Sequence, residues 1–362
     1  DARITNANST ISATPAGGSD TISVGAILAM NKVATDVDAS IKTASTLSAG
    51  SGLTVTVDDN AKITSNVEAS SVAIGAGTDD SSGVAIGVTL ARNEVHAAAD
   101  ALIESATSGT LTGDVLVEAK KDALIDASVT STAIGVALSP GKSVAVSGSG
   151  ALAFNTILGS NNATIKNSTL TTVAGAGQAG DVSVTTDDDS RIDALVRSVS
   201  VSVAVGAKTS AGIAIGLSVA KNQIGWDTST TSHDHLSTAK PTTLTTGKKV
   251  KVANGPLGSR IFEYLGANLS NSEGIDLSTV NYFDKSTWAP ADLSTNAAEV
   301  FATVNGGTIT AAGDLDVAAD SDSEINATVL SGAVGVAGGK TAVAVSAAGV
   351  YTENTIRTDV RG

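Results

Sequence analysis

Alternating large and small residues recur along the chain in pairs of runs, and a short turn separates the two runs of each pair. One pair extends from Ile134 to Val146, with the turn Ser139-Pro140-Gly141-Lys142 in its middle. A period of two residues is typical of β-strands, and β-branched residues crowd these runs. No 3.6-residue period accompanies them, so amphipathic helices are not expected. The pattern predicts a hairpin of two strands in every unit.

The two faces of these strands differ in side-chain size. In the run 198–205, Val occupies every second position and Ser or Ala fills the positions between. Large residues opposite small ones allow neighbouring layers to approach closely. Neither face carries charge, which predicts that both faces are covered.

Three short motifs recur at nearly fixed offsets and define a unit of about 62 residues. The first motif, Asp/Asn-Ala/Ser-x-Ile, ends at Ile4, Ile63, Ile125, Ile192 and Ile325. The second, Asn-x-Val/Ile, begins at Asn31, Asn93, Asn155, Asn222 and Asn354, and the third, Ala-x-Ile/Val, ends at Ile41, Ile103, Ile165 and Val304. The chain begins and ends in the middle of a unit, so we expect an internal segment of a longer repeat protein.

These units predict an all-β fold, a β-solenoid resembling a β-helix, with about three coils of roughly 20 residues per unit. At about 4.8 Å per coil, the coils would form a rod about 70 Å long. The recurring Asn residues fall at predicted strand ends. They either stack as ladders that bond successive coils or simply occupy turns.

A segment of different composition interrupts the fourth unit. The predicted organisation is therefore repeats over 1–225, an inserted small β module over 226–297, and continued repeats over 298–362. Within the insertion, Lys249–Val252 and Ile261–Leu265 are predicted to form a hairpin around the turn 254–258. The insertion also holds both Trp residues of the chain.

The aromatic residues of the insertion allow two interpretations. They form the module's own small core, or they form an exposed platform that stacks on sugars. For the second interpretation the candidate glycan contacts are Trp226, Tyr264, Tyr282 and Trp288.

Composition narrows the classes of function. The formal net charge is −14 and the chain has no Cys, which disfavours nucleic acid as a partner and excludes disulfides and thiol-bound metals. No apolar run of about 18 residues is present, so membrane insertion is not expected. Aromatic residues make up only 2% of the chain, although hydrophobic residues make up 42%. This combination indicates thin, closely stacked layers rather than an ordinary core or a disordered chain.

Two glycine-rich segments match nucleotide-binding patterns only superficially. Gly175–Gly180 fits GxGxxG, but a predicted strand follows where a helix is required. Gly135–Ser143 ends in Gly-Lys-Ser, but Val136 stands where the first Gly of a P-loop belongs. Both are expected to be turns, and no cofactor is predicted.

Metal binding and catalysis find little support in the sequence. His233-Asp234-His235 could offer two imidazoles, and Asp58-Asp59, Asp79-Asp80 and Asp187-Asp188-Asp189 are carboxylate clusters. Solvated turns explain both patterns, with calcium as the one cofactor left open. His96 is expected at the surface or at a strand end. No nucleophile, base and acid are spaced as in a hydrolase, so no enzyme is predicted.

The units and the insertion together resemble a known kind of protein. The string Ser131-Thr132-Ala133-Ile134-Gly135-Val136-Ala137, followed by Asn155-Thr156-Ile157, is similar to repeats of giant bacterial exoproteins, the leukotoxin-type filamentous adhesins, which are related in style to filamentous haemagglutinins. The insertion resembles a module of those proteins in Phe262-Glu263-Tyr264-Leu265-Gly266, Asp276-Leu277-Ser278-Thr279 and Tyr282-x-Asp284-x-x-x-Trp288. Ser71–Gly75 also resembles strings in trimeric adhesin heads, whose repeat is far shorter.

The resemblance implies secretion to the bacterial cell surface and a structural or adhesive role. We expect a rod or fibre for attachment, cell–cell contact or extracellular matrix. The expected partners are other repeats, further copies of the chain, glycans, or the surface of a host or neighbouring cell. Carbohydrate binding through the insertion is the alternative function.

Overall fold

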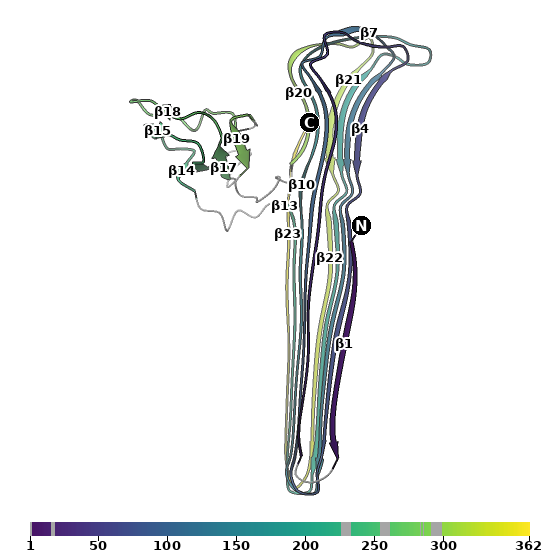
Figure 1. Ribbon diagram of the computed structural model, residues 1–362, viewed down its shortest axis with the longest axis vertical. Helices are drawn as coiled ribbons and strands as arrows, with labels where there is room; N and C mark the ends of the chain where they lie inside the picture. Colours follow the sequence, from purple (N-terminus) through teal and green to yellow (C-terminus); the bar gives the residue numbers. More distant parts are fainter. Residues whose placement is uncertain are drawn as a thin grey trace.

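The computed structural model is an elongated all-β molecule whose long axis follows the strands (Figure 1). It describes residues 2–15, 19–225, 233–253, 261–282, 284, 286–290 and 299–362. Three parallel sheets form the body. Sheet 1 contains, in order, β1 (Ala2–Pro15), β5 (Lys62–Ala76), β9 (Leu124–Ser139), β12 (Arg191–Gly206) and β22 (Glu324–Gly338). Sheet 2 contains β2 (Ser19–Lys42), β6 (Ser81–Glu104), β10 (Ser143–Val173), β13 (Thr209–Gly225) and β23 (Thr341–Arg357), extended by β20 (Glu299–Thr310) and β24 (Asp359–Arg361). Sheet 3 contains β4 (Leu53–Asp59), β8 (Val115–Lys121), β11 (Val182–Asp188) and β21 (Leu315–Ser321). The short strands β3 (Leu47–Ala49) and β7 (Ser108–Thr112) lie where the chain crosses from sheet 2 to sheet 3.

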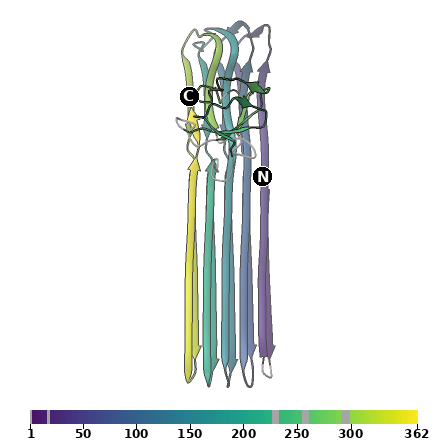
Figure 2. The same ribbon diagram turned by 90° about the vertical axis from the view of Figure 1, so that its left-hand side faces the viewer.

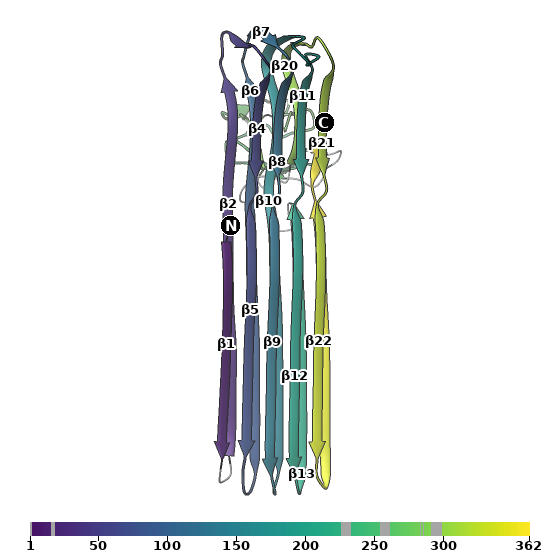
Figure 3. The ribbon, with the colours of Figure 1, turned by 90° about the vertical axis from the view of Figure 1, so that its right-hand side faces the viewer.

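Each strand pairs in parallel with the equivalent strand of the next unit. Ile63 of β5 is the partner of Ile125 of β9, and Asn93 of β6 is the partner of Asn155 of β10. The unit of about 62 residues is thus the spacing between hydrogen-bonded neighbours. Figure 3 shows the five strands of sheet 1 side by side in this order. Among the described residues of the body, no pairing occurs at a spacing of about 20, so the expected three coils per unit are wrong.

The expected hairpins are also corrected by the structure. β9 and β10 follow one another around the turn 140–142, but they belong to two different sheets and do not pair with each other. The turn therefore forms an arch between two layers that face each other, and the same holds for β5 and β6 and for β12 and β13. As a result the long axis runs along the strands, and the five units stack across it (Figure 2).

The stem is the part of the body where sheet 1 faces sheet 2 next to these turns, and its small residues point inward. In β9 the inward side chains shrink from Ile125 and Val129 to Ala133 and Ala137 towards the turn. The branched residues of the same strand, such as Ile134 and Val136, point outward and are partly exposed. The prediction that both strand faces are covered therefore fails within this chain, because only the face with small residues is covered.

Backbone contact between the two sheets explains the inward glycines. A Cβ atom added to Gly83 of β6 would lie 2.3 Å from the carbonyl oxygen of Val136 in sheet 1. One added to Gly135 of β9 would lie 2.6 Å from the carbonyl oxygen of Val146 in sheet 2. Stacked sheets usually lie about 10 Å apart because side chains fill the gap. Here glycine removes the side chain and lets the two backbones approach much more closely.

Hydroxyl groups link the two sheets where glycine does not. Ser71 Oγ donates to the carbonyl oxygen of Ser23 at 2.8 Å, and Thr89 Oγ1 donates to that of Thr130 at 2.9 Å. Farther along the stack, Ser143 Oγ donates to the carbonyl oxygen of Val205 at 2.7 Å. The interior of the stem is thus a polar and small-residue layer, whereas larger aliphatic side chains fill the other end of the body.

The aliphatic core lies between sheets 2 and 3 and at the junction with the stem. The first motif contributes Ile63, Ile125 and Ile192, and the third contributes Ile103 and Ile165, all fully buried. Their equivalents in successive units lie side by side in the parallel register. The recurrence of these motifs therefore reports a stacked core.

The insertion interrupts a strand. Gly225, the last residue of β13, is the partner of Arg357, and Glu299, the first of β20, is the partner of Asp359. The stretch 226–298 thus stands opposite the single residue Thr358. Its described strands form two small sheets of their own, which lie on the sheet 2 side of the body (Figure 1). These are β14 (His235–Leu236), β16 (Lys249–Lys251), β17 (Ile261–Tyr264) and β19 (Trp288–Pro290) in one sheet, and β15 (Thr243–Leu244) and β18 (Leu269–Ser270) in the other. The antiparallel pairing of β16 with β17 confirms the predicted hairpin, whereas its turn lies outside the described residues.

Candidate functional site

The aromatic residues of the insertion form one packed cluster. The ring centroids of Tyr264 and Trp288 lie 5.1 Å apart, and those of Tyr282 and Trp288 lie 4.8 Å apart. Phe262 packs on Tyr282 with a centroid distance of 5.1 Å. Such tilted and edge-on contacts are the arrangements that aromatic rings favour in cores.

The three described candidate glycan contacts are buried in this cluster. Tyr264, Tyr282 and Trp288 are 4%, 7% and 3% exposed. Both phenols are bonded internally: the Tyr264 hydroxyl donates to the carbonyl oxygen of Ala267, and that of Tyr282 to the carbonyl oxygen of Leu277. Burial also raises the pKa of Tyr282. These residues form the module's core and present no exposed ring faces to a sugar. Trp226 lies outside the described residues.

The recurring Asn residues form a continuous ladder of side-chain hydrogen bonds. Asn31 donates to Asn93 at 2.6 Å, Asn93 to Asn155 at 2.7 Å, Asn155 to Asn222 at 2.8 Å, and Asn222 to Asn354 at 2.8 Å. Asn93, Asn155 and Asn222 are fully buried. The ladder interpretation is thus confirmed, but the Asn residues lie within the long strands of sheet 2 and not at strand ends or corners.

A buried ion pair lies at the end of sheet 3. Lys121 Nζ is 2.9 Å from Asp188 Oδ2, and both side chains are almost inaccessible to water. Asp187 and Asp189 on either side of Asp188 are exposed. Partial desolvation and the neighbouring carboxylates, Asp320 for the first and Asp187 for the second, raise the pKa of both groups. In the run Asp187–Asp189, the middle carboxylate is thus buried and paired with Lys121. The two outer carboxylates are exposed and lie close to other negative charges.

Three carboxylates from two units meet on sheet 2. Asp36, Asp38 and Asp100 each place an oxygen within 4.8 Å of the others, and this is the one such group among the described residues. Asp38 and Asp100 are register partners, and Asn162 Nδ2 donates to Asp100 Oδ1 at 2.7 Å. Oxygen ligands of this kind suit calcium, but the sequence reasoning did not select these residues. The only signal was that Asp38 and Asp100 occupy the same position of the unit.

The histidines do not form such a group. Asp234, between His233 and His235, instead accepts hydrogen bonds from Lys248 Nζ at 2.8 Å and Lys249 N at 2.9 Å. His96 is buried within β6 and contacts Glu94, so the expected surface or strand-end position is wrong. Burial alone would raise the pKa of Glu94, but hydrogen bonding and the charge of His96, together with Lys32, hold it below its ordinary value.

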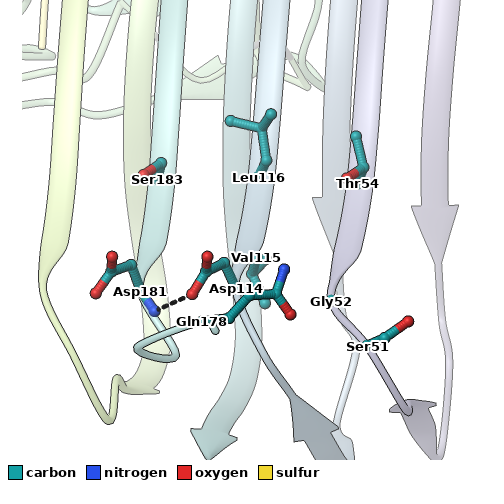
Figure 4. A pocket seen from close by; sticks show the side chains of 9 residues that line it. All are labelled: Ser51, Gly52, Thr54, Asp114, Val115, Leu116, Gln178, Asp181 and Ser183. Atoms are coloured by element: carbon teal, nitrogen blue, oxygen red, sulfur yellow. Dashed lines mark hydrogen bonds between the residues drawn. The ribbon is translucent and has the colours of Figure 1, made fainter. Parts of the chain in front are cut away.

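An open groove of about 380 Å³ lies where the chain enters sheet 3 (Figure 4). Asp114 Oδ1 there accepts from the backbone N–H groups of Gly180 and Asp181, at 2.9 and 3.0 Å. Asp181 Oδ1 in turn accepts from the N–H of Asp314 at 2.7 Å. These carboxylates bind backbone N–H groups of the next unit, so the acidic groups of the groove have a structural role in the stack of units.

The glycine-rich segment beside this groove is a turn. Gly175 and Gln178 exchange backbone hydrogen bonds at 3.0 and 3.3 Å, and Gly177 and Gly180 have φ angles of +81° and +83°. Gln178 projects over Gly113, where a Cβ atom would lie 2.0 Å from its side-chain oxygen. A strand, β11, follows, as the sequence predicts. The Gly-Lys-Ser segment is likewise the turn between β9 and β10.

Comparison with known proteins gives no match to this chain. No family model, no curated protein and no solved structure matches it. Among the described residues, the structure has no helix with the length and apolar character needed to cross a membrane.

Proposed function

We propose that this chain is a β-solenoid segment of a long structural or adhesive protein on the bacterial cell surface. One observation carries the proposal: polar and aliphatic residues of every unit bond or pack against the same residues of the next unit. The Asn ladder is the clearest case, because each described unit both extends the ladder and leaves it able to continue. In this proposal one unit makes one turn of the solenoid.

The polar groups with recognisable chemistry support a structural role. The Lys121–Asp188 pair is buried, Asp114 and Asp181 bind backbone N–H groups of neighbouring units, and the aromatic cluster is a core. Each of these groups contributes to the stability of the fold through its contacts. A surface location fits the acidic composition and the family resemblance of the repeats and the insertion. The insertion then decorates the side of the fibre.

Electron microscopy of lengthened chains tests this proposal. Ten additional copies of the unit 62–123 would be placed in tandem before Leu124. If each unit adds one strand spacing of about 4.8 Å, the stack grows by about 48 Å in one direction while its other two dimensions stay constant. A matched chain with ten scrambled copies of the same composition is the control. Separate globular beads in place of one continuous ribbon would contradict the proposal.

A further inference from the structure

The outer face of sheet 1 in the stem is a flat aliphatic surface. Nine of the ten outward positions in its two central rows are Val or Ile. The centre of this surface consists of Val72, Ile134 and Val201 in one row and Ile74, Val136 and Val203 in the next. Ile74 is 37% exposed and Val334, at the last strand, is 54% exposed. The nearest charged residues on this face, Glu68 and Arg197, lie at the border of the surface.

A parallel sheet with such a face normally has a cover. Parallel sheets are usually buried on both sides, and contiguous exposed apolar patches of several hundred Å² mark interaction sites. The two aliphatic rows cover on the order of 300 Å². Together with the uncharged row on either side of them, five strands at about 4.8 Å by eight residues at about 3.3 Å, the face covers on the order of 600 Å². Stable protein interfaces bury about 600–1,000 Å² on each partner, so the face is large enough for one.

Sheet 2 offers a less continuous face. Its outward rows are broken by Gly148 and Gly150, where the neighbouring units have Ile86 and Val88. The inserted module also stands on the sheet 2 side of the body, whereas Figure 3 shows sheet 1 open along its whole length. The module lies beside the end of the body away from the turns and leaves the stem part of sheet 2 clear, so sheet 1 is preferred because its aliphatic rows are more continuous.

We infer that a second copy of this chain covers this face, sheet 1 against sheet 1, about a two-fold axis that runs along β9. The charged border favours this arrangement. Glu68 on β5 and Arg197 on β12 are both register partners of Thr130 in the central strand, one on each side of it. A two-fold axis along β9 places Glu68 of one copy opposite Arg197 of the second copy, and the reverse. The inference rests on the structural role proposed above and gives that role a lateral contact.

Sedimentation velocity over a wide range of concentrations tests the pairing. The unchanged chain should dimerise reversibly. Val136→Lys should raise the dimer dissociation constant by roughly a hundredfold or more, because the two-fold axis buries two unpaired ammonium groups. Val146→Lys is the matched control, since Val146 faces outward from sheet 2 in the same unit. Circular dichroism of both variants verifies folding. A monomeric parent chain, or dimers weakened by Val146→Lys and not by Val136→Lys, would overturn the inference.

A charge exchange tests the axis. Arg197→Glu should weaken dimerisation by roughly tenfold, and adding Glu68→Arg should restore it. Failure of the double variant to recover would overturn the arrangement. The dimer should also persist when phosphatidylcholine vesicles are added. If the chain instead floats with the vesicles and the dimer disappears, the face binds lipid and the inference is overturned. A parent chain that stays monomeric but still lengthens as a ribbon with added units contradicts the pairing alone and leaves the structural role standing.

Discussion

The side-chain amide of Asn93 donates a hydrogen bond of 2.7 Å to the side-chain oxygen of Asn155, which lies 62 residues further along the chain. Both side chains are fully buried, and the side-chain amide of Asn155 in turn donates a hydrogen bond to the side-chain oxygen of Asn222. A buried amide has both donors and an acceptor to satisfy, and a neighbour of the same type in the same register supplies the partner. The ladder therefore depends on Asn at the same position of each unit, and it holds neighbouring units in one register.

Breaking this ladder in the middle should destabilise the chain. Asn155→Ala leaves a donor on Asn93 and an acceptor on Asn222 buried without their partner, at a cost of about 1–3 kcal/mol for each group. Chemical denaturation should show this loss in the free energy of unfolding. Asn66→Ala, at an exposed position of β5, is the control and should change stability by less than about 0.5 kcal/mol. Equal stability of the two variants would contradict a structural role for the ladder.

Glycines on the inner and the outer face of the stem should respond differently to an added methyl group. Gly83→Ala places a Cβ atom 2.3 Å from a backbone oxygen of the facing sheet, so the sheets must separate, at a cost of about 1–3 kcal/mol or more. Gly148→Ala meets no atom within 4 Å and should be neutral or slightly stabilising. Thermal melting of the two variants makes the comparison. A tolerated Gly83→Ala would contradict the close approach of the two sheets at Gly83.

Acid should unfold the insertion before the body. Hydrogen bonds from Lys240 and Ser278 lower the pKa of Asp276 from its ordinary 3.8 to about 2. A lowered pKa means that the carboxylate's stabilising effect is complete above pH 3.8 and disappears as the pH falls through about 2. The body holds groups of both kinds. The lowered pKa of Glu94 means that a stabilising charge is lost in acid, whereas desolvation and neighbouring carboxylates raise the pKa of Asp187 and Asp189, so acidification towards pH 3.8 relieves two destabilising charges.

Tryptophan fluorescence separates these two responses, since both Trp residues belong to the insertion. Between pH 4 and about 2 the fluorescence should shift towards that of exposed Trp while the far-ultraviolet circular dichroism of the body persists. Asp276→Asn should flatten the acid transition of the fluorescence, and Asp316→Asn on sheet 3 serves as the control. Loss of the β signal at higher pH than the fluorescence change would reverse the expected order.

The insertion should be removable without loss of the body. Replacing residues 226–298 by a single Gly would join β13 to β20 as one strand, because that stretch stands opposite Thr358 alone. The preceding unit has Gly159 at the same place in its uninterrupted strand β10. The shortened chain should remain soluble and keep its cooperative β-sheet melting transition. Aggregation or loss of that transition would show that the module is part of the body's core.

The sequence predicts the unit length, the β-structure and the insertion well, because each depends on residues that recur or change abruptly. The recurrence of Ile63, Ile125 and Ile192 every 62 to 67 residues is the register of neighbouring strands. The sequence does not reveal how many turns of the solenoid each unit makes, because runs of period two look alike in one long strand and in several short ones. Strands such as β10, from Ser143 to Val173, exceed the usual length of a strand.

The sequence also does not predict which face of each strand points into the stem. A run of Val alternating with Ser or Ala has no charged side from which to orient the strand. Its hydroxyl-bearing side, which would ordinarily be expected to face water, faces inward here. Close approach between Gly83 and Val136 decides that the small residues face inward, and that contact joins residues far apart in the chain. The sequence does not predict the cluster of Asp36, Asp38 and Asp100 for the same reason, because only the register of the strands brings their two units together.

A distance between the first and last units tests whether each unit makes one turn of the stack. The chain has no Cys, so Lys32→Cys and Thr355→Cys allow two spin labels at equivalent outward positions of β2 and β23. Pulsed electron spin resonance on chains diluted with unlabelled protein would measure their separation. Four strand spacings predict about 19 Å between the labelled backbones. A separation near 58 Å would instead indicate three turns per unit and would rule out one turn per unit.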